Sequence, residues 1–356
     1  MRISRTATLA VAALSTLTLA ACSSGSEAPD ASSDAPSASA APTGTVTVVT
    51  HDSFYVDDAL LASFEDETGL TVELVAPGDA GALVNQLVLT KDAPLGDVVY
   101  GIDNTFATRA TEAGVLATYS PAAPAVADAA SYAVPGAEDL LTAIDFSDVC
   151  LNYDLAAFPD GAPAFADLTL PEYAGMVSVT NPATSSPGLA FMLATIAATD
   201  EDGWLSWWEA MRENDVRVTA SWSDTYYTDF SAPNYGGDFP IVLSYASSPP
   251  FEVVDGEPTT AAMLDTCFRQ VEYAGVLEGA ENPAAAELVV EWMLSDEFQA
   301  ALPESMYVYP VSSSVEVPAD WAQYAPLADS PTTLDPARID AMRDEWIDAW
   351  TSTVLD

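Results

Sequence analysis

The chain has 356 residues, of which 49% are hydrophobic and 10% aromatic, a composition typical of a globular protein with a sizeable core. It contains 54 acidic residues but only 9 Lys and Arg residues, which gives a formal net charge of -45 at pH 7. This charge excludes nucleic acid as a partner, because the phosphate backbone would repel the chain.

The first 22 residues have the order of charged and apolar residues found in secretory signals. Two arginines within the first five residues precede the uncharged segment Ala7–Leu19, which is too short to span a bilayer as a permanent helix. The signal ends in Leu19-Ala20-Ala21-Cys22, which resembles the lipobox of bacterial lipoproteins. We expect residues 1–22 to be a lipoprotein signal peptide and Cys22 to anchor the chain to the membrane through lipid, with a plain secretory signal as the alternative.

Residues 23–44 have the composition of a disordered tether. They contain only small, polar and acidic residues and no aromatic ring, so ordering them would bury too little apolar surface. The remaining chain of about 310 residues is large for a single core and predicts two lobes. No other segment reaches transmembrane length.

The residues after the tether predict a parallel sheet covered by helices. Thr45–Thr50 is β-branched throughout and predicts a buried strand, and residues 57–68 predict a helix that ends at Gly69. Leu70–Ala76 and Asp97–Gly101 predict the next two strands. This alternation is typical of parallel sheets, in which ligands lie beyond the carboxyl ends of the strands.

The middle of the chain predicts a second α/β lobe. Val177–Thr180, Val216–Ser221 and Ile241–Tyr245 predict strands, and Leu189–Ala198 predicts an apolar helix. The Ser- and Thr-rich loop 181–188 leads into this helix. Its hydroxyls and free backbone N–H groups favour an anionic or polar part of a ligand.

The C-terminal part predicts two helices, which begin near Asn282 and Asp335. Trp346 and Trp350 recur at helical spacing in the last one. We expect these tryptophans to pack in the core rather than to contact a ligand.

Two cysteines, Cys150 and Cys267, remain once Cys22 is acylated. In an exported protein such a pair is expected to be joined by a disulfide. Zinc would need more soft ligands than these two cysteines and the single histidine, His51, so we expect no metal site.

Catalytic motifs are absent from the sequence. There is no Gly-x-Ser-x-Gly elbow, no phosphate loop ending in Gly-Lys-Ser/Thr, and no Gly-x-Gly-x-x-Gly after a strand. With 54 acidic residues, pairs of carboxylates occur by chance and carry no information. We therefore expect a binding protein without a cofactor, not an enzyme.

Aromatic residues gather in loops that follow predicted strands. Trp222 has polar residues on both sides in Ser221-Trp222-Ser223-Asp224, which is a poor pattern for a core residue. Tyr226, Tyr245 and Tyr307 lie in comparable segments. Flat rings suit a flat, cationic heterocycle through stacking and cation–π attraction, although loop aromatics pack within a lobe equally often.

Six segments, in this order, resemble those of bacterial thiamine-binding proteins. They are Thr50-His51-Asp52-Ser53-Phe54, Gly101-Ile102-Asp103-Asn104, Thr184-Ser185-Ser186-Pro187-Gly188-Leu189, Trp222-Ser223-Asp224-Thr225-Tyr226, Leu243-Ser244-Tyr245-Ala246-Ser247-Ser248-Pro249 and Tyr307-Val308-Tyr309-Pro310-Val311. The resemblance implies a two-lobed α/β fold of the type II periplasmic-binding class, with sheets flanked by helices and a ligand cleft between the lobes. The implied parts are residues 45–147 for the first part of lobe 1, 148–270 for lobe 2, and 271–356 for the return to lobe 1 and the C-terminal helices.

The resemblance also implies a monomer that captures thiamine or a thiamine phosphate for the permease and ATPase of an ABC importer. Asp79 resembles the acidic residue that meets the aminopyrimidine, and the cysteine segments resemble those where the chain crosses between lobes. The implied ligand-binding residues are His51, Asp79, Asp103, Thr184, Ser185, Ser186, Gly188, Trp222, Tyr226, Tyr245, Ser247 and Tyr307. His51 and Tyr307 replace the tyrosine and tryptophan usual in the family, which keeps a flat ring and alters its hydrogen bonding.

Two alternatives remain open at this point. Ferric-binding relatives share the fold and use a Tyr-Tyr dipeptide, which Tyr226-Tyr227 together with His51 would imitate. The motifs that flank this dipeptide, however, match those of thiamine-binding proteins. The second alternative is a surface interaction lipoprotein that uses the same lobes without import.

Overall fold

The computed structural model describes residues 41–233 and 235–356, without the side chains of residues 200–202. Residues 41–356 form one compact unit. The predicted signal peptide, Cys22 and the tether up to residue 40 lie outside the described residues. No helix in the described part of the chain is long and apolar enough to cross a membrane.

The first strands form a parallel sheet, as their spacing predicts. In chain order the elements are β1 (Gly44–Val49), α1 (Asp58–Thr68), β2 (Leu70–Val75), α2 (Ala80–Leu89), β3 (Val98–Asp103) and α3 (Ala107–Ala113). β1 lies between β2 and β3 and is parallel to both. Helix α1 begins where the Asp57 side chain accepts the N–H groups of Ala59 and Leu60, and it ends at Gly69 with φ 73°.

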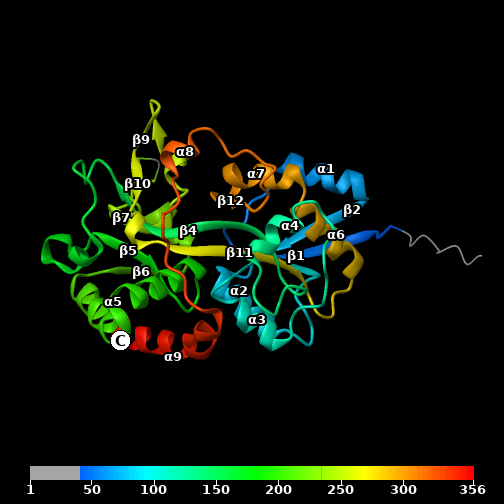
Figure 1. Ribbon diagram of the computed structural model, residues 1–356, viewed down its shortest axis with the longest axis horizontal. Coiled ribbons are helices and arrows are strands. Elements are labelled where there is room, and N and C mark those ends of the chain that lie inside the picture. Colours follow the sequence, from blue (N-terminus) through cyan, green and yellow to red (C-terminus); the bar gives the residue numbers. More distant parts are fainter. Residues whose placement is uncertain (1–40, 234) are drawn as a thin grey trace, which may run out of the picture. The chain divides into compact units, whose positions relative to one another are not determined.

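Two long strands join this part of the sheet to the other half (Figure 1). They are β4 (Thr142–Asp154) and β11 (Phe268–Val276), which run antiparallel to each other. β11 also pairs with β3, and β4 pairs with β7 (Ile241–Tyr245). Beyond β7 lie β5 (Val177–Thr180) and β6 (Arg217–Thr219), and the short strands β10 (Thr260–Ala262) and β12 (Tyr309–Pro310) pair with β4. This mixed sheet confirms the predicted α/β class, whereas the lobe boundaries stay a prediction.

Helix α5 (Ser186–Glu213) is much longer than the predicted helix over 189–198. It begins at Ser185, whose hydroxyl accepts the Gly188 N–H. Polar residues after Ala198 interrupt the apolar pattern in the sequence, but Trp204 and Trp208 beyond them are buried and extend the packed face of the helix. Tertiary packing therefore overrides the local pattern here. The polar residues that follow β6 lead into the π-helical turn η4 (Asp224–Asp229).

The remaining helices pack on the sheet or on other helical segments. They are α4 (Val126–Ala129), α6 (Pro283–Met293), α7 (Asp296–Met306), α8 (Trp321–Tyr324) and α9 (Pro336–Val354), and β8 (Val253–Val254) pairs with β9 (Glu257–Pro258) in a separate ribbon. α9 packs against both α5 and α3 and runs below them in Figure 1. Trp346 and Trp350 of α9 are buried, as predicted, and Trp350 packs edge-on against Trp208 of α5.

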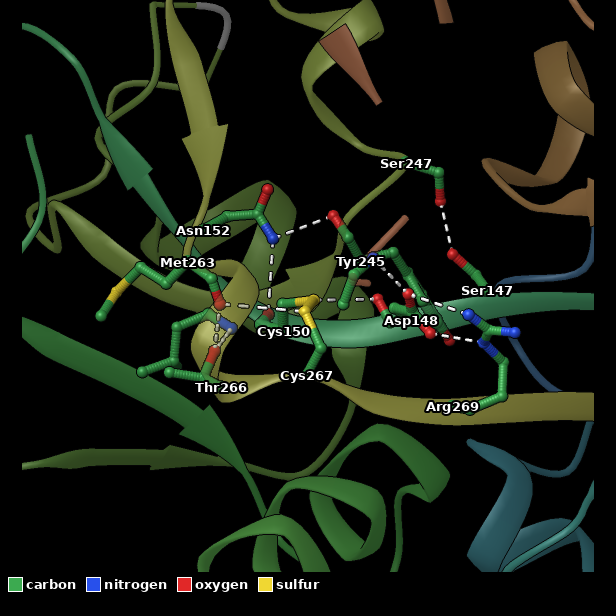
Figure 2. Close-up of a disulfide and its surroundings, with 12 residues drawn as sticks. Ser147, Asp148, Cys150, Asn152, Tyr245, Ser247, Met263, Thr266, Cys267 and Arg269 are labelled. Atoms are coloured by element: carbon green, nitrogen blue, oxygen red, sulfur yellow. Dashed lines mark hydrogen bonds and ion pairs between the residues drawn. A yellow bond between two sulfur atoms is a disulfide. The ribbon is translucent and has the colours of Figure 1, made fainter. Parts of the chain in front are cut away.

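A disulfide joins Cys150 of β4 to Cys267, which directly precedes β11 (Figure 2). The two Cα atoms are 4.3 Å apart although 117 residues separate them along the chain. Next to the disulfide, Arg269 Nε of β11 lies 2.5 Å from Asp148 Oδ1 of β4. The two strands that join the halves of the sheet are therefore held together by a covalent bond and an ion pair.

Candidate functional site

A cavity lined by both aromatic and polar side chains lies where the two halves of the sheet meet. In this conformation the cavity volume is about 30 Å³, which is well below that of typical small-molecule sites, so a ligand of that size has to widen the cavity. Segments from both halves line it: the residues are His51, Ser53, Asp79, Ser186, Pro187, Trp222, Tyr227, Tyr245, Glu272, Ser305, Met306, Tyr307 and Val308. Six of the predicted ligand-binding residues are among them.

Trp222 forms the main aromatic wall of this cavity. Its ring stacks on Tyr226 at 5.0 Å between centroids and 13° between planes, and its Nε1–H donates to Ser244 Oγ at 3.0 Å. Tyr226 is fully buried behind it and donates its hydroxyl to Glu252. Tyr226 thus fixes the plane of Trp222 without lining the cavity itself.

Tyr307 also lines the cavity and holds an unusual backbone conformation. It ends helix α7 with φ 61°, in the left-handed region that bulky residues rarely adopt. The Ser247 hydroxyl donates to the Tyr307 carbonyl, and the Tyr307 ring lies edge-on to Trp222 at 6.1 Å. The buried Ser247 therefore acts by holding Tyr307 in place.

Asp79 links the two sides of the cavity. It precedes α2, and its Oδ1 accepts the Ala80 N–H at 2.6 Å. Its Oδ2 accepts the backbone N–H of Trp222, from the other half of the sheet, at 2.9 Å. Burial raises the pKa of Asp79 to about 6, although the hydrogen bond from Trp222 opposes this rise. This carboxyl is therefore close to its titration point at neutral pH.

His51 follows β1 and lies against the floor of the cavity. Its Nδ1 accepts the Ser53 N–H at 3.2 Å, and its Nε2 is 3.4 Å from Glu272 Oε1. Gly101 of β3 makes room for the ring, because a Cβ at that position would lie 2.3 Å from His51 Cδ2. Burial lowers the pKa of His51, but Glu272, Asp79 and Asp52 together outweigh burial, and the pKa is raised above 6.5.

Other predicted residues lie behind the cavity surface. Asp103 is fully buried, and burial raises its pKa to about 7 against the hydrogen bonds from Thr105 and Gln270. Gln270 Nε2 donates both to Asp103 Oδ2 and to the Ser186 hydroxyl, which lines the cavity. Asp103 is thus connected to the cavity only through the hydrogen bonds that Gln270 makes to Asp103 and to Ser186.

Thr184, Ser185 and Gly188 shape the loop and the start of α5. The Thr184 hydroxyl donates to the Ala220 carbonyl, and the Thr184 carbonyl accepts the Ala82 N–H at 3.0 Å. Gly188 packs closely over Thr180, since a Cβ there would lie 2.6 Å from the Thr180 carbonyl oxygen. These three residues position Ser186 and do not line the cavity.

Glu272 is the main cavity residue that sequence reasoning missed. It lies in the middle of β11, a strand whose other residues are nearly all buried. The sequence does show a glutamate within this strand. This pattern could have indicated a functional residue, because buried carboxylates are rare unless they are paired or functional. Ser53 and the end of α7 were missed as well, and Tyr227, which the sequence assigned only to the iron alternative, also lines the cavity.

The chain is similar to known proteins over most of its length. Residues 93–330 match the family model of bacterial extracellular solute-binding protein. The thiamine-binding periplasmic proteins of Escherichia coli and Salmonella typhimurium are 28% and 29% identical over 320 residues, which cover 87% of this chain and 93% of each relative.

Solved structures agree with this relationship. A periplasmic thiamin binding protein matches with a TM-score of 0.77 at 27% identity, covering 87% of this chain and 96% of that one. Iron-bound HitA from Pseudomonas aeruginosa matches with a TM-score of 0.68 at 21% identity, covering 87% and 99%. The second likeness shows the fold alone.

Proposed function

Because the chain belongs to the family of bacterial extracellular solute-binding proteins, we propose that it captures thiamine or a thiamine phosphate and delivers it to the permease and ATPase of an ABC importer. The observation that carries the proposal is the wall formed by Trp222 stacked on the buried Tyr226, in a cavity that Asp79 also lines. The names of the relatives support it. We propose that the protein acts as a monomer and carries out no catalysis.

The parts of thiamine correspond to groups that line the cavity. The Trp222, Tyr245 and Tyr307 rings would cover the two heterocycles, since aromatic faces attract a cationic ring. Asp79 would accept the exocyclic amine of the pyrimidine. Ser186, in the first turn of the long helix α5, would receive the hydroxyethyl or phosphate end of the ligand.

Ferric iron is the weaker candidate. Iron binding by a Tyr-Tyr dipeptide requires two phenolate oxygens in the cavity, but Tyr226 is fully buried and its hydroxyl donates to Glu252. Burial raises the pKa of Tyr226 well above its ordinary value, which opposes formation of the phenolate. In the described residues, no group of three or more His, Cys, Asp or Glu side chains has the arrangement of a metal site.

Calorimetry with thiamine, its monophosphate and its diphosphate tests the proposed function. We expect saturable binding with one site per chain, and no charge-transfer colour when ferric iron is added. The same titrations decide between thiamine and its phosphates by their affinities. Absence of binding to all three compounds would overturn the proposal and favour a surface interaction protein.

The membrane anchor is a separate proposal, which rests on the sequence around Cys22. We propose that residues 1–22 direct export and that acylated Cys22 holds the protein on the outer face of the cell membrane. Cys22→Ala should then release the protein into the soluble fraction. Fractionation with immunodetection measures this, and equal membrane retention of the variant would contradict the lipoprotein assignment.

A further inference from the structure

Three buried carboxyl groups lie side by side beneath the cavity, on three neighbouring strands. Glu272 of β11 is paired directly with Asp103 of β3 on one side and with Asp145 of β4 on the other. Asp103 and Asp145 are fully buried, and Glu272 is only 4% exposed. Like charges directly opposite each other in a sheet repel, so this row needs protons or a cation to be stable.

The hydrogen bonds within the row leave Glu272 without a strong donor. Asp103 has the Thr105 hydroxyl and Gln270, at 2.8 Å and 3.1 Å. The Tyr100 hydroxyl donates to Asp145 Oδ2 at 2.6 Å and lies 3.5 Å from Glu272 Oε2. One phenol proton therefore serves two carboxyl groups and lies much closer to Asp145.

The only base near Glu272 in the described residues is the imidazole of His51. Its Nε2 lies 3.4 Å from Glu272 Oε1 but is not aligned for a hydrogen bond, and it is buried without another partner. Its Nδ1 accepts the Ser53 N–H, so charging the ring would cost that hydrogen bond. No lysine or arginine of the described chain lines the cavity. The titratable groups that interact electrostatically with Glu272 are His51, Tyr100, Asp103, Asp145 and Tyr245. Asp52 and Asp79 act in turn on His51.

Protons therefore compensate the negative charge while the cavity is empty. Burial, followed by the charge of Glu272, raises the pKa of Asp145 well above its ordinary value. The second oxygen of Asp145, Oδ1, is buried and has no hydrogen-bond partner. A proton on Asp145 relieves the repulsion in the row, but it leaves the Glu272 carboxylate exposed to whatever fills the cavity.

We propose that the Glu272 carboxylate is the counter-ion of the cationic ring of the ligand, and that binding of this ring displaces one proton from its neighbours Asp145 and His51. This inference rests on the proposed thiamine function and adds to it a charge partner and a pH dependence. A fixed positive charge beside Glu272 favours the ionised carboxyl groups and the neutral imidazole, so the proton leaves to water. By linkage, affinity then rises with pH wherever the empty site still holds that proton, by at most about tenfold per pH unit.

Calorimetry of the full-length protein with thiamine tests this inference, with runs at each pH in buffers of different ionisation enthalpy. The runs cover roughly pH 6.5 to 8.5, a range that begins at the ordinary pKa of histidine. For the natural protein we expect release of up to one proton and tighter binding as pH rises. Glu272→Gln, which keeps shape and volume, should bind thiamine at least tenfold more weakly and release fewer protons.

Two controls test whether a loss of affinity in Glu272→Gln comes from the charge next to the cationic ring or from another cause. Glu278→Gln removes one acid from an exposed position just after β11, so it tests the effect of net charge and should leave binding unchanged. The neutral aminopyrimidine half of thiamine should bind to the natural protein and to Glu272→Gln with similar affinity, because it lacks the cationic ring.

The outcomes distinguish this inference from the proposed function. The assignment of Glu272 as the counter-ion is overturned if the natural protein binds thiamine without exchanging protons, or if Glu272→Gln keeps full affinity. In both cases the thiamine function stands. Proton release that persists unchanged in Glu272→Gln would assign the proton to a group that does not depend on Glu272, such as Asp79, and would also overturn the inference. If the natural protein binds no thiamine at any pH, the proposed function fails and the inference fails with it.

Discussion

Asp79→Ala should weaken thiamine binding by about tenfold to a hundredfold, and Trp222→Ala by at least as much. Asp79 would lose a charge-assisted hydrogen bond of about 1.5–3 kcal/mol to the exocyclic amine. It would also lose the acceptor of the Trp222 N–H and therefore loosen the wall. Trp222 would lose its stacking and a desolvated cation–π contact of about 2 kcal/mol. Calorimetry well below the melting temperature measures both effects.

Stability controls are needed because both side chains also support the fold. Trp222 is 7% exposed and packs on Tyr226, so its removal should also lower the melting temperature of the ligand-free protein. Trp350→Ala removes a fully buried tryptophan far along the chain, in α9, and should lower the melting temperature without changing affinity. Asp79→Asn keeps an oxygen for the Ala80 N–H and should lose affinity with less loss of stability. Unchanged affinity in both alanine variants would contradict the cavity as the binding site.

Replacing both Cys150 and Cys267 by alanine should lower the free energy of unfolding by about 2–5 kcal/mol. The bridge spans 117 residues, and closing so long a loop restricts the unfolded chain strongly. Alanine suits the site because both cysteines are buried and pack against Ala246 and Ala328. Denaturant unfolding, followed by tryptophan fluorescence, measures the change.

A reducing agent gives the matched control for the disulfide prediction. It should lower the stability of the natural protein to that of the double variant and leave the double variant unchanged. Equal stability of the oxidised natural protein and the variant would show that the bridge contributes nothing. Thiol titration of the unfolded, unreduced protein should find neither Cys150 nor Cys267 free.

Local sequence patterns predict most of the fold. The β-branched run at Thr45–Thr50 and the helix between Asp57 and Gly69 appear where predicted, because strand propensity and helix capping act over a few residues. Val177–Thr180 forms the predicted strand β5. Helix α5 was predicted too short, because packing of buried tryptophans carries it across residues that locally interrupt the pattern.

The site was predicted less completely than the fold. Trp222, Tyr245 and Tyr307 were predicted from aromatic residues in polar loops and from family resemblance, and they line the cavity. Tyr226 and Asp103 lie in the layer behind it. A motif tells which segment approaches a site, but the direction of each side chain depends on the packing of neighbouring elements.

The sequence by itself determined the α/β class and the alternation of strands and helices, because these depend on short-range periodicity and capping. Only the tertiary structure decided that Asp79 accepts the N–H of Trp222, a residue 143 positions away. It also decided that Glu272 lies between Asp103 and Asp145. Strand register sets such neighbours, and a shift of one residue would turn Glu272 to the other face of the sheet. The charge balance of the cavity therefore follows from pairing between distant strands, which no local pattern specifies.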